Sequence, residues 1–193
     1  MRSYIFIFFS ISLLLSSCLP EEKEIIPKPI GYFRIVELEK SYQSYEGNCP
    51  FTFEYPTYAQ ITPYKKDPTK TCWFDVQFPS YNATLYMSYE NIKGQDPRIY
   101  FEDSRSLVYS HTVKANGILE FPINDPERKV YGILYRIEGD AASNYQFHAT
   151  DSVNHFLRGS LYFNARTNLD SITPALQFLS LDVDHLITTL NWK

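Results

Sequence analysis

The sequence predicts an α+β domain in which an antiparallel sheet of about six or seven strands is packed by two amphipathic helices. Three observations lead to this fold class. The 193 residues include 16 Tyr and 14 Phe, side chains that favour half-buried strands. Short segments of alternating apolar residues follow one another between turn residues, which suits consecutive antiparallel pairing more than crossover units. Two longer segments show the apolar period of a helix.

Residues 1–17 have the composition of a cleaved signal peptide and are not expected to join the fold. Arg2 supplies one positive charge, and the apolar run over residues 4–15 is shorter than the roughly 20 residues that span a bilayer. A transmembrane anchor is the less favoured alternative. The run ends in small residues before Cys18, which is typical of a lipoprotein signal. We therefore expect the Cys18 thiol to carry the lipid, including palmitate.

Residues 18–30 are expected to form an extended tether, because Pro27 and Pro29 disfavour helix. The acidic residues that follow the lipidated cysteine are alternatively a sorting address for surface export. Residues 31–193 are enough for one domain with its own core and too few for two ordinary ones. We expect a single globular domain.

The first half of that domain contains three predicted strands. Residues 51–55 alternate and place three aromatic side chains on one face, and residues 72–78 and 83–89 are also predicted to be strands. Residues 31–36 are expected to start the folded part as a short strand or an extended arm. The polar segment 62–70 is predicted to be a loop.

The period then changes to that of a helix. Asp96 followed by proline is typical of a helix start, and the apolar stripe predicts a helix over residues 97–115 that ends at Asn116-Gly117. Four further strands are predicted over residues 118–121, 130–138, 145–150 and 155–163.

The last predicted element is a second helix that begins near Asp170 and Ser171, which offer cap oxygens. Its apolar face has to lie against the sheet. That face consists of Ile172, Ala175, Leu176, Leu179, Val183, Leu186, Ile187 and Leu190. The resulting order of elements is similar to that of Mog1/PsbP-like sandwich domains.

Export to an oxidising compartment makes the cysteine count informative. With Cys18 used for the lipid, Cys49 and Cys72 remain as a pair. A disulfide between them would close a loop of about 24 residues and stabilise the fold by roughly 3.4 kcal/mol. Two free buried thiols are the alternative. A zinc site is less favoured, because neither cysteine lies in a Cys-x-x-Cys motif or near a histidine.

The sequence contains no clear motif for catalysis, and we expect no catalytic residue, metal site or cofactor. Asp151, Ser152 and His155 come nearest to a nucleophile with a base, but they lack a nucleophile elbow and an obvious oxyanion donor. His148 and His155, with Asp140 and Asp151 nearby, lack the close spacing of metal ligands. There is no P-loop or dinucleotide motif. A net charge of −4 without a basic cluster argues against nucleic-acid partners.

Two surface features give further hypotheses. Ser152 lies in an Asp-Ser-Val pattern of bacterial O-glycosylation, and the similar pattern at Ser171 also serves as a helix cap. Residues 139–147 lead from small side chains into aromatic ones and are predicted to leave an accessible partner surface. An ordinary glycine-initiated loop is the alternative. The residues of the predicted surface are Asp140, Ala141, Ala142, Ser143, Tyr145 and Phe147.

Six blocks spread over nearly all of the mature chain carry a family resemblance. They are residues 27–35, 49–56, 72–74, 132–143, 150–152 and 155–164. In combination they are far more specific than any one block. On these blocks the chain resembles the gliding motility lipoprotein GldD family of Bacteroidota.

The resemblance implies a membrane-anchored component needed for gliding, in a motility system linked to the type IX secretion machinery, and it brings no active site with it. We expect a non-catalytic accessory or scaffold lipoprotein that binds other envelope proteins. Its expected location is the periplasmic face of the outer membrane, with the inner membrane as the alternative. The alternative function is a binding module for peptidoglycan, glycan or secreted cargo that uses exposed aromatic side chains. An envelope hydrolase comes third.

Overall fold

The computed structural model describes residues 36–165 and 168–193. The predicted signal peptide, the predicted lipidation site Cys18, the predicted tether and most of the predicted arm at 31–36 lie outside the described residues. Within the described ranges, no helix is long and apolar enough to cross a membrane.

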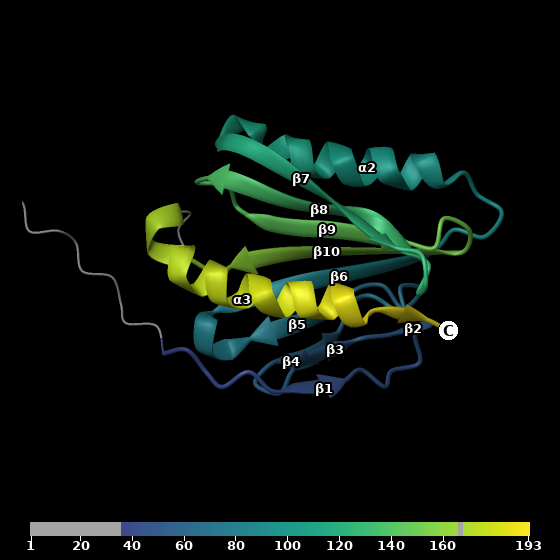
Figure 1. Cartoon of the computed structure of the whole chain (residues 1–193), viewed down its shortest axis with the longest axis horizontal. Helices are drawn as coiled ribbons and strands as arrows, with labels where there is room; N and C mark the ends of the chain where they lie inside the picture. The colour runs from purple at the N-terminus through teal and green to yellow at the C-terminus, as the bar shows by residue number, and fades with distance from the viewer. Residues whose placement is uncertain (1–35, 166–167) are drawn as a thin grey trace, which may run out of the picture. The chain divides into compact units, whose positions relative to one another are not determined.

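Seven strands form one antiparallel sheet, which confirms the predicted fold class (Figure 1). In chain order the strands are β4 (Gln60–Pro63), β5 (Phe74–Phe78), β6 (Ala83–Asn91), β7 (Ala115–Asp125), β8 (Val130–Gly139), β9 (Tyr145–Thr150) and β10 (His155–Phe163). Across the sheet the order is β4-β5-β6-β10-β9-β8-β7. The β6–β10 pairing therefore joins an early half of the sheet to a late half.

Helix α3 (Leu169–Thr189) packs on one face of this sheet and crosses in front of it in Figure 1. Its Leu179 and Val183 enter the main hydrophobic core together with Leu157 and Leu161 of β10. Alternate residues of a strand point to opposite faces, so Arg158 and Ser160, which alternate with these leucines, face away from α3. Fully burying a leucine or valine side chain of this core contributes about 1.5–3 kcal/mol to stability. The main core therefore lies between the sheet and α3.

Helix α2 (Pro97–Tyr109) covers only part of the opposite face. Val108 packs against Tyr135 and Ile137 of β8 in a second core cluster. Phe101 stacks on His148 of β9 with the ring centroids 5.6 Å apart. Phe101 also packs on Phe156 near the start of β10, with the ring centroids 6.0 Å apart. The contacts of α2 therefore reach β8, β9 and the start of β10, and the part of the face over β5, β6 and the rest of β10 stays open.

Two small antiparallel sheets complete the core. They are formed by β1 (Tyr42–Ser44) with β3 (Glu54–Pro56), and by β2 (Phe51–Thr52) with β11 (Asn191–Trp192). The prediction of one continuous strand over 51–55 is therefore wrong, since its two ends pair with different partners. The Phe51 and Phe53 rings nevertheless share the core, as their alternation predicts.

The first helix is shorter than predicted. It begins where expected, with the Asp96 carboxylate accepting a backbone N–H of the first turn. It ends at Tyr109, and a 3-10 turn, η2 (Ser110–Val113), leads into β7. The Ser110 hydroxyl donates to a carbonyl of the preceding turn at 2.6 Å, a local bond that competes with the helical ladder. β7 is accordingly longer than the predicted strand 118–121.

Two other boundaries also differ from the prediction. Part of the predicted loop 62–70 is β4, a short strand without apolar alternation that pairs with β5. The cap of α3 is Asn168, whose side chain accepts the N–H of Ser171 at 3.3 Å. Because Asn is as good an N-cap as Asp or Ser, the sequence alone allowed either start.

Candidate binding site on the open sheet face

A pocket of about 350 Å³ lies on the part of the sheet that α2 leaves open. Strands β5, β6 and β10 and the loop before β5 line it. The lining residues are Tyr64, Trp73, Asp75, Tyr86, Met87, Ser88, Arg158, Ser160 and Tyr162. We call it the sheet pocket. Its volume is typical of small-molecule sites, which span roughly 300–1,000 Å³.

Strand register aligns the polar residues of this pocket although they are far apart in the chain. Asp75 pairs with Tyr86, and Tyr86 pairs with Ser160 of β10. In the next row Arg158 pairs with Ser88. Residues two positions apart on a strand share a face, so Arg158 and Ser160 point to the same side. The sheet thus presents a cation, a carboxylate and hydroxyls on one surface.

Arg158 forms no salt bridge with a carboxylate of the described residues. None of the salt bridges among the described residues involves it. Its Nη2 donates to Oε1 of Gln146 at 3.3 Å, and Gln146 is only 1% exposed. Nε of Arg158 and Nε2 of Gln146 are both buried without a partner in the part of the chain that the structure describes. A buried polar atom that lacks a partner is destabilising, so the site has unused hydrogen-bonding capacity.

The pKa values around Arg158 reflect this environment. Burial lowers the pKa of Arg158 itself, against the opposing influence of Tyr162 and Asp103. Burial, with the Arg158 charge as a second cause, lowers the pKa of His148 to about 4 and also lowers the pKa of His111. The positive charge is therefore strong enough to affect two neighbouring histidines.

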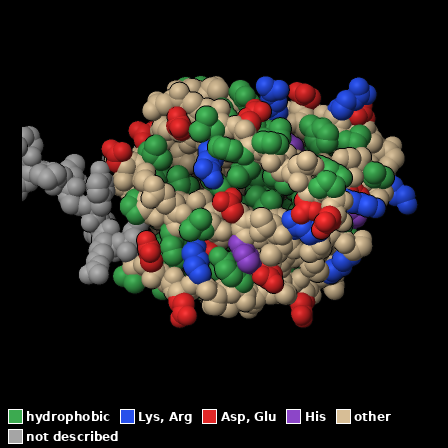
Figure 2. Space-filling view, in the orientation of Figure 1, with side chains coloured by type: hydrophobic (Ala, Val, Ile, Leu, Met, Phe, Trp, Pro, Cys, Tyr) green, Lys and Arg blue, Asp and Glu red, His purple; other side chains and the backbone are tan. Residues whose placement is uncertain are grey.

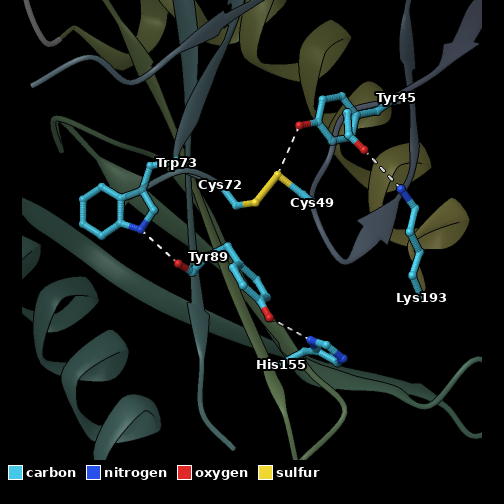
Figure 3. The surroundings of a disulfide bond; sticks show 8 residues. Tyr45, Cys49, Cys72, Trp73, Tyr89, His155 and Lys193 are labelled. Atoms are coloured by element: carbon cyan, nitrogen blue, oxygen red, sulfur yellow. Dashed lines mark hydrogen bonds between the residues drawn. A yellow bond between two sulfur atoms is a disulfide. The ribbon is translucent and has the colours of Figure 1, made fainter. Parts of the chain in front are cut away.

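Aromatic rings form the walls of the sheet pocket. The centroids of Tyr64 and Trp73 lie 5.5 Å apart, and those of Tyr86 and Tyr162 lie 5.5 Å apart at a steep angle. Tyr86 is 45% exposed. The Trp73 indole N–H donates to the carbonyl of Tyr89 at 3.0 Å (Figure 3). This bond orients the largest ring of the pocket.

The disulfide involves the residue that precedes Trp73 in the chain. Cys49 and Cys72 are joined with their Cα atoms 5.6 Å apart, which agrees with the pairing predicted from the cysteine count (Figure 3). A hydrogen bond of 3.2 Å links the Tyr45 hydroxyl to Cys49 Sγ. Because Cys72 immediately precedes Trp73, the covalent link restrains the chain that carries the indole.

Charged residues of both signs surround the pocket. Burial raises the pKa of Asp75, although Lys66 opposes the shift. Lys70 forms a salt bridge with Glu90 at 2.5 Å and lies 4.9 Å from the centroid of the Trp73 ring. The lysine charge is thus already paired at the rim. Arg158 is the basic side chain among the lining residues, and Asp75 is the acidic one.

A second hollow, which we call the α3 groove, lies between α3 and the β7–β8 hairpin on the other face of the sheet (Figure 2). Its volume is about 460 Å³. Leu119 and Leu181 line it and are 46% and 58% exposed. Phe121 is 39% exposed, with the Arg136 guanidinium 4.8 Å from its ring. Exposed apolar side chains that gather in this way mark interaction surfaces.

The predicted partner surface over residues 139–147 is formed only in part. Asp140 and Ala142 are exposed. The other four residues are buried, at 2% for Ala141, 1% for Ser143, 2% for Tyr145 and 1% for Phe147. Most of this segment is needed for the core of β9, so it is not accessible as a continuous surface. Tyr145 does line the α3 groove, where its hydroxyl donates to Asp184 at 2.5 Å.

The residues of the turn between β9 and β10 mostly make structural contacts. Asp151 accepts three backbone N–H groups, which lower its pKa although burial acts in the opposite direction. Nδ1 of His155 is hydrogen-bonded to Tyr89 at 2.8 Å (Figure 3). Ser152 is exposed, so its glycosylation stays a prediction. Among the described residues, no group of three potential ligands could hold a metal ion.

Sequence reasoning did not find the sheet pocket. Its signal was present in β10, where Arg158, Ser160 and Tyr162 alternate with apolar residues and thereby define a polar face. The alternation shows that these side chains leave the core, but it does not show what they meet. Their neighbours Asp75 and Tyr86 depend on the register with β6 and β5, which is a property of the folded sheet.

Comparison with known proteins gives one family and a distant structural similarity. The family model described as gliding motility lipoprotein GldD matches residues 22–192. No curated protein matches the chain. Among solved structures, the chain is similar to the solution structure of cyanobacterial PsbP (CyanoP) from Synechocystis, at 12% sequence identity and a TM-score of 0.46. That similarity covers 86% of this chain and 99% of the cyanobacterial one.

Proposed function

The chain belongs to the gliding motility lipoprotein GldD family, and from this premise we propose that it is a non-catalytic accessory or scaffold component of the gliding machinery. Its family is one of membrane-anchored envelope proteins. In the proposed arrangement the signal peptide 1–17 is removed, lipid on Cys18 anchors the chain, residues 18–30 act as a tether, and residues 31–193 form one domain that binds other envelope proteins.

The α3 groove is the observation that carries the scaffold role. A protein partner needs apolar surface that is exposed in the free domain, and Leu119, Phe121 and Leu181 provide it. Arg136 and Asp184, of opposite charge, lie among the groove residues. An apolar patch with polar residues at its margin is the usual composition of a transient protein interface. The proposed partners are gliding components and proteins of the associated type IX secretion machinery, met at the periplasmic face of the outer membrane.

Photo-crosslinking in cells tests this proposal. A photoreactive residue is placed at Leu181 or at Leu119 of the full-length lipoprotein, and the captured proteins are identified by mass spectrometry. Val153, which is 62% exposed in the turn between β9 and β10, is the matched control. Capture of a gliding or secretion component from the groove positions and not from Val153 is the expected result. The proposal fails if neither groove position captures such a component while the lipoprotein is anchored at its normal level.

A second candidate function is an envelope binding module for peptidoglycan, glycan or secreted cargo. The sheet pocket favours it, because an exposed concave surface with Tyr86 and Trp73 in its wall is suited to stacking against a ligand. Purified full-length lipoprotein in detergent is incubated with cell-wall sacculi and with envelope polysaccharide. Retention that decreases in Tyr86→Ala and not in Phe121→Ala would support the module. Equal retention of the two variants would contradict a role for the pocket.

A further inference from the structure

We propose that the sheet pocket binds an acidic saccharide, with the carboxylate of a sugar ring held by Arg158 and the ring lying against the aromatic wall. This inference rests on the second candidate function, the envelope binding module, and it assigns that module a ligand class and a set of contact residues. It does not depend on the α3 groove or on the scaffold role.

The first argument is the missing counter-ion. Arg158 is half-buried, it makes no salt bridge within the described ranges, and its described hydrogen bond goes to a neutral amide. Guanidinium and carboxylate groups match each other in planar, bidentate geometry. A ligand carboxylate would therefore complete an arrangement that the free protein leaves open.

The second argument is how the guanidinium is held. Gln146 lies beneath it at 1% exposure and accepts hydrogen bonds from both Arg158 and Ser160, at 3.3 and 3.2 Å. A side chain held from below by a buried amide is preorganised, so less conformational entropy is lost when a ligand binds. Arg158 is thus oriented before any ligand arrives.

The third argument is the set of aromatic and polar side chains that line the pocket around Arg158. Tyr64, Trp73, Tyr86 and Tyr162 offer ring faces, and Asp75, Ser88 and Ser160 offer acceptors and donors suited to sugar hydroxyls. Small-ligand sites typically combine such apolar walls with a few convergent polar groups.

The charge balance of the pocket selects a carboxylate over a phosphate. Asp75 contributes a negative charge to the same surface as the guanidinium, and Lys70 is already paired with Glu90 at the rim. A dianionic phosphate would meet one unpaired cation together with a repelling carboxylate. A monoanionic carboxylate needs only Arg158.

Matched sugar pairs test the inference with the full-length mature lipoprotein in detergent micelles. Glucuronic acid is compared with glucose, and N-acetylmuramic acid with N-acetylglucosamine, because within each pair the acid adds a carboxylate to a similar ring. Binding is followed by calorimetry and by the fluorescence of Trp73, with Trp192→Phe removing the other indole. We expect the acidic member of at least one pair to bind at least about tenfold more tightly, as is typical of a charge-assisted bond.

Variants assign the preference to named residues. Arg158→Gln should abolish the preference for the acid, and Arg158→Lys should retain only part of it, because lysine keeps the charge without the planar fork. Arg98→Gln removes the same charge from an exposed position on α2 that does not line the pocket, and it should leave the preference intact. Tyr86→Ala should weaken the binding of acidic and of neutral sugars to the same extent. Tyr86 is well exposed, so this variant remains informative even if a change at Arg158 impairs folding.

The outcomes separate this inference from the function on which it rests. Equal binding of acidic and neutral sugars would overturn the carboxylate assignment and leave the binding module in place. A preference that survives in Arg158→Gln would also overturn the assignment. Binding of no saccharide or cell-wall material by the wild-type protein would overturn both.

Discussion

Nζ of Lys40 lies 2.6 Å from Oδ1 of Asp182, and the two residues are 142 positions apart in the chain. Asp182 is 1% exposed on the inner face of α3, and the hydroxyls of Tyr42 and Tyr58 also donate to its carboxylate. The ammonium group of Lys40 lies 3.6 Å from the centroid of the Phe178 ring. This cluster ties the segment before β1 to the C-terminal helix.

Removing both partners of this ion pair should destabilise the domain by less than the sum of the two single removals. Lys40→Met leaves a buried carboxylate without its cation, and we expect the free energy of unfolding to fall by about 2–3 kcal/mol, below the upper range for buried pairs because Lys40 is partly exposed. In Lys40→Met/Asp182→Asn the charge is gone from both sides, so the loss should be smaller than the sum of the two single losses. Urea denaturation of the four proteins measures the coupling. Strict additivity would show that the pair contributes no coupling energy.

His148 should make the fold sensitive to acid. Burial, and secondarily Arg158, lower its pKa from 6.5 to about 4. A lowered folded-state pKa contributes stability that is fully present above pH 6.5 and is lost as the pH falls through 4, in total about 3 kcal/mol. His148→Gln should therefore lose less stability than the wild type between pH 6.5 and 4. Ser104→Ala keeps the imidazole, whose Nδ1 lies 3.3 Å from the serine hydroxyl, and should keep the steep pH dependence. Parallel wild-type and His148→Gln curves would refute this assignment.

The disulfide should stabilise the fold by lowering the conformational entropy of the unfolded chain. Its cysteines are 23 positions apart, and closing a loop of that length stabilises the fold by about 3.4 kcal/mol. Cys49→Ala/Cys72→Ala should lower the free energy of unfolding by this amount in urea titrations followed by circular dichroism. Reductant should produce a similar loss in the wild type and no change in the double variant. If reductant leaves the wild-type curve unchanged, the two thiols are not paired in the protein.

Gly132 of β8 should not tolerate a side chain. A Cβ there would lie 1.9 Å from the backbone oxygen of His148 on β9. Backbone atoms cannot move away without breaking the ladder, so Gly132→Ala should cost about 3 kcal/mol or more. Gly94→Ala is the control, because no atom lies within 4 Å of the added group and only the strain of φ +75° is expected, about 1 kcal/mol. Thermal unfolding of both variants measures the difference. Equal losses would show that the two strands can separate locally.

The later strands were predicted best because their signal is local. The predicted ranges 145–150 and 155–163 coincide with β9 and β10, and 130–138 falls one residue short of β8. In each of these strands apolar and polar residues alternate or all residues are buried. A turn sequence precedes each of them. β4 and β1 were missed, because such short polar strands exist only through the partners they pair with. For the same reason residues 51–55 appeared as one strand and are divided in the structure.

The candidate site residues were likewise predicted only in part from the sequence. The pairing of Cys49 with Cys72 followed from cysteine parity and export, which need no coordinates. The surface predicted from the composition of residues 139–147 was largely buried, because Tyr145 and Phe147 are core residues of a central strand. An exposed loop and a buried strand start can have the same composition. Only the position of β9 between β8 and β10 distinguishes them.

Periodicity and residue blocks along the chain were enough to predict the fold class, the approximate strands and helices and the family, and the cysteine count was enough to predict the pairing of Cys49 with Cys72. These follow from periodicity, parity and residue blocks that are read along the chain. The tertiary structure alone decided that Arg158 stands beside Ser88 and in one pocket with Asp75, and that Lys40 meets Asp182. The physical reason is that strand register and helix docking minimise the free energy of the whole domain, so the neighbours of a side chain are chosen by packing of segments far apart in sequence.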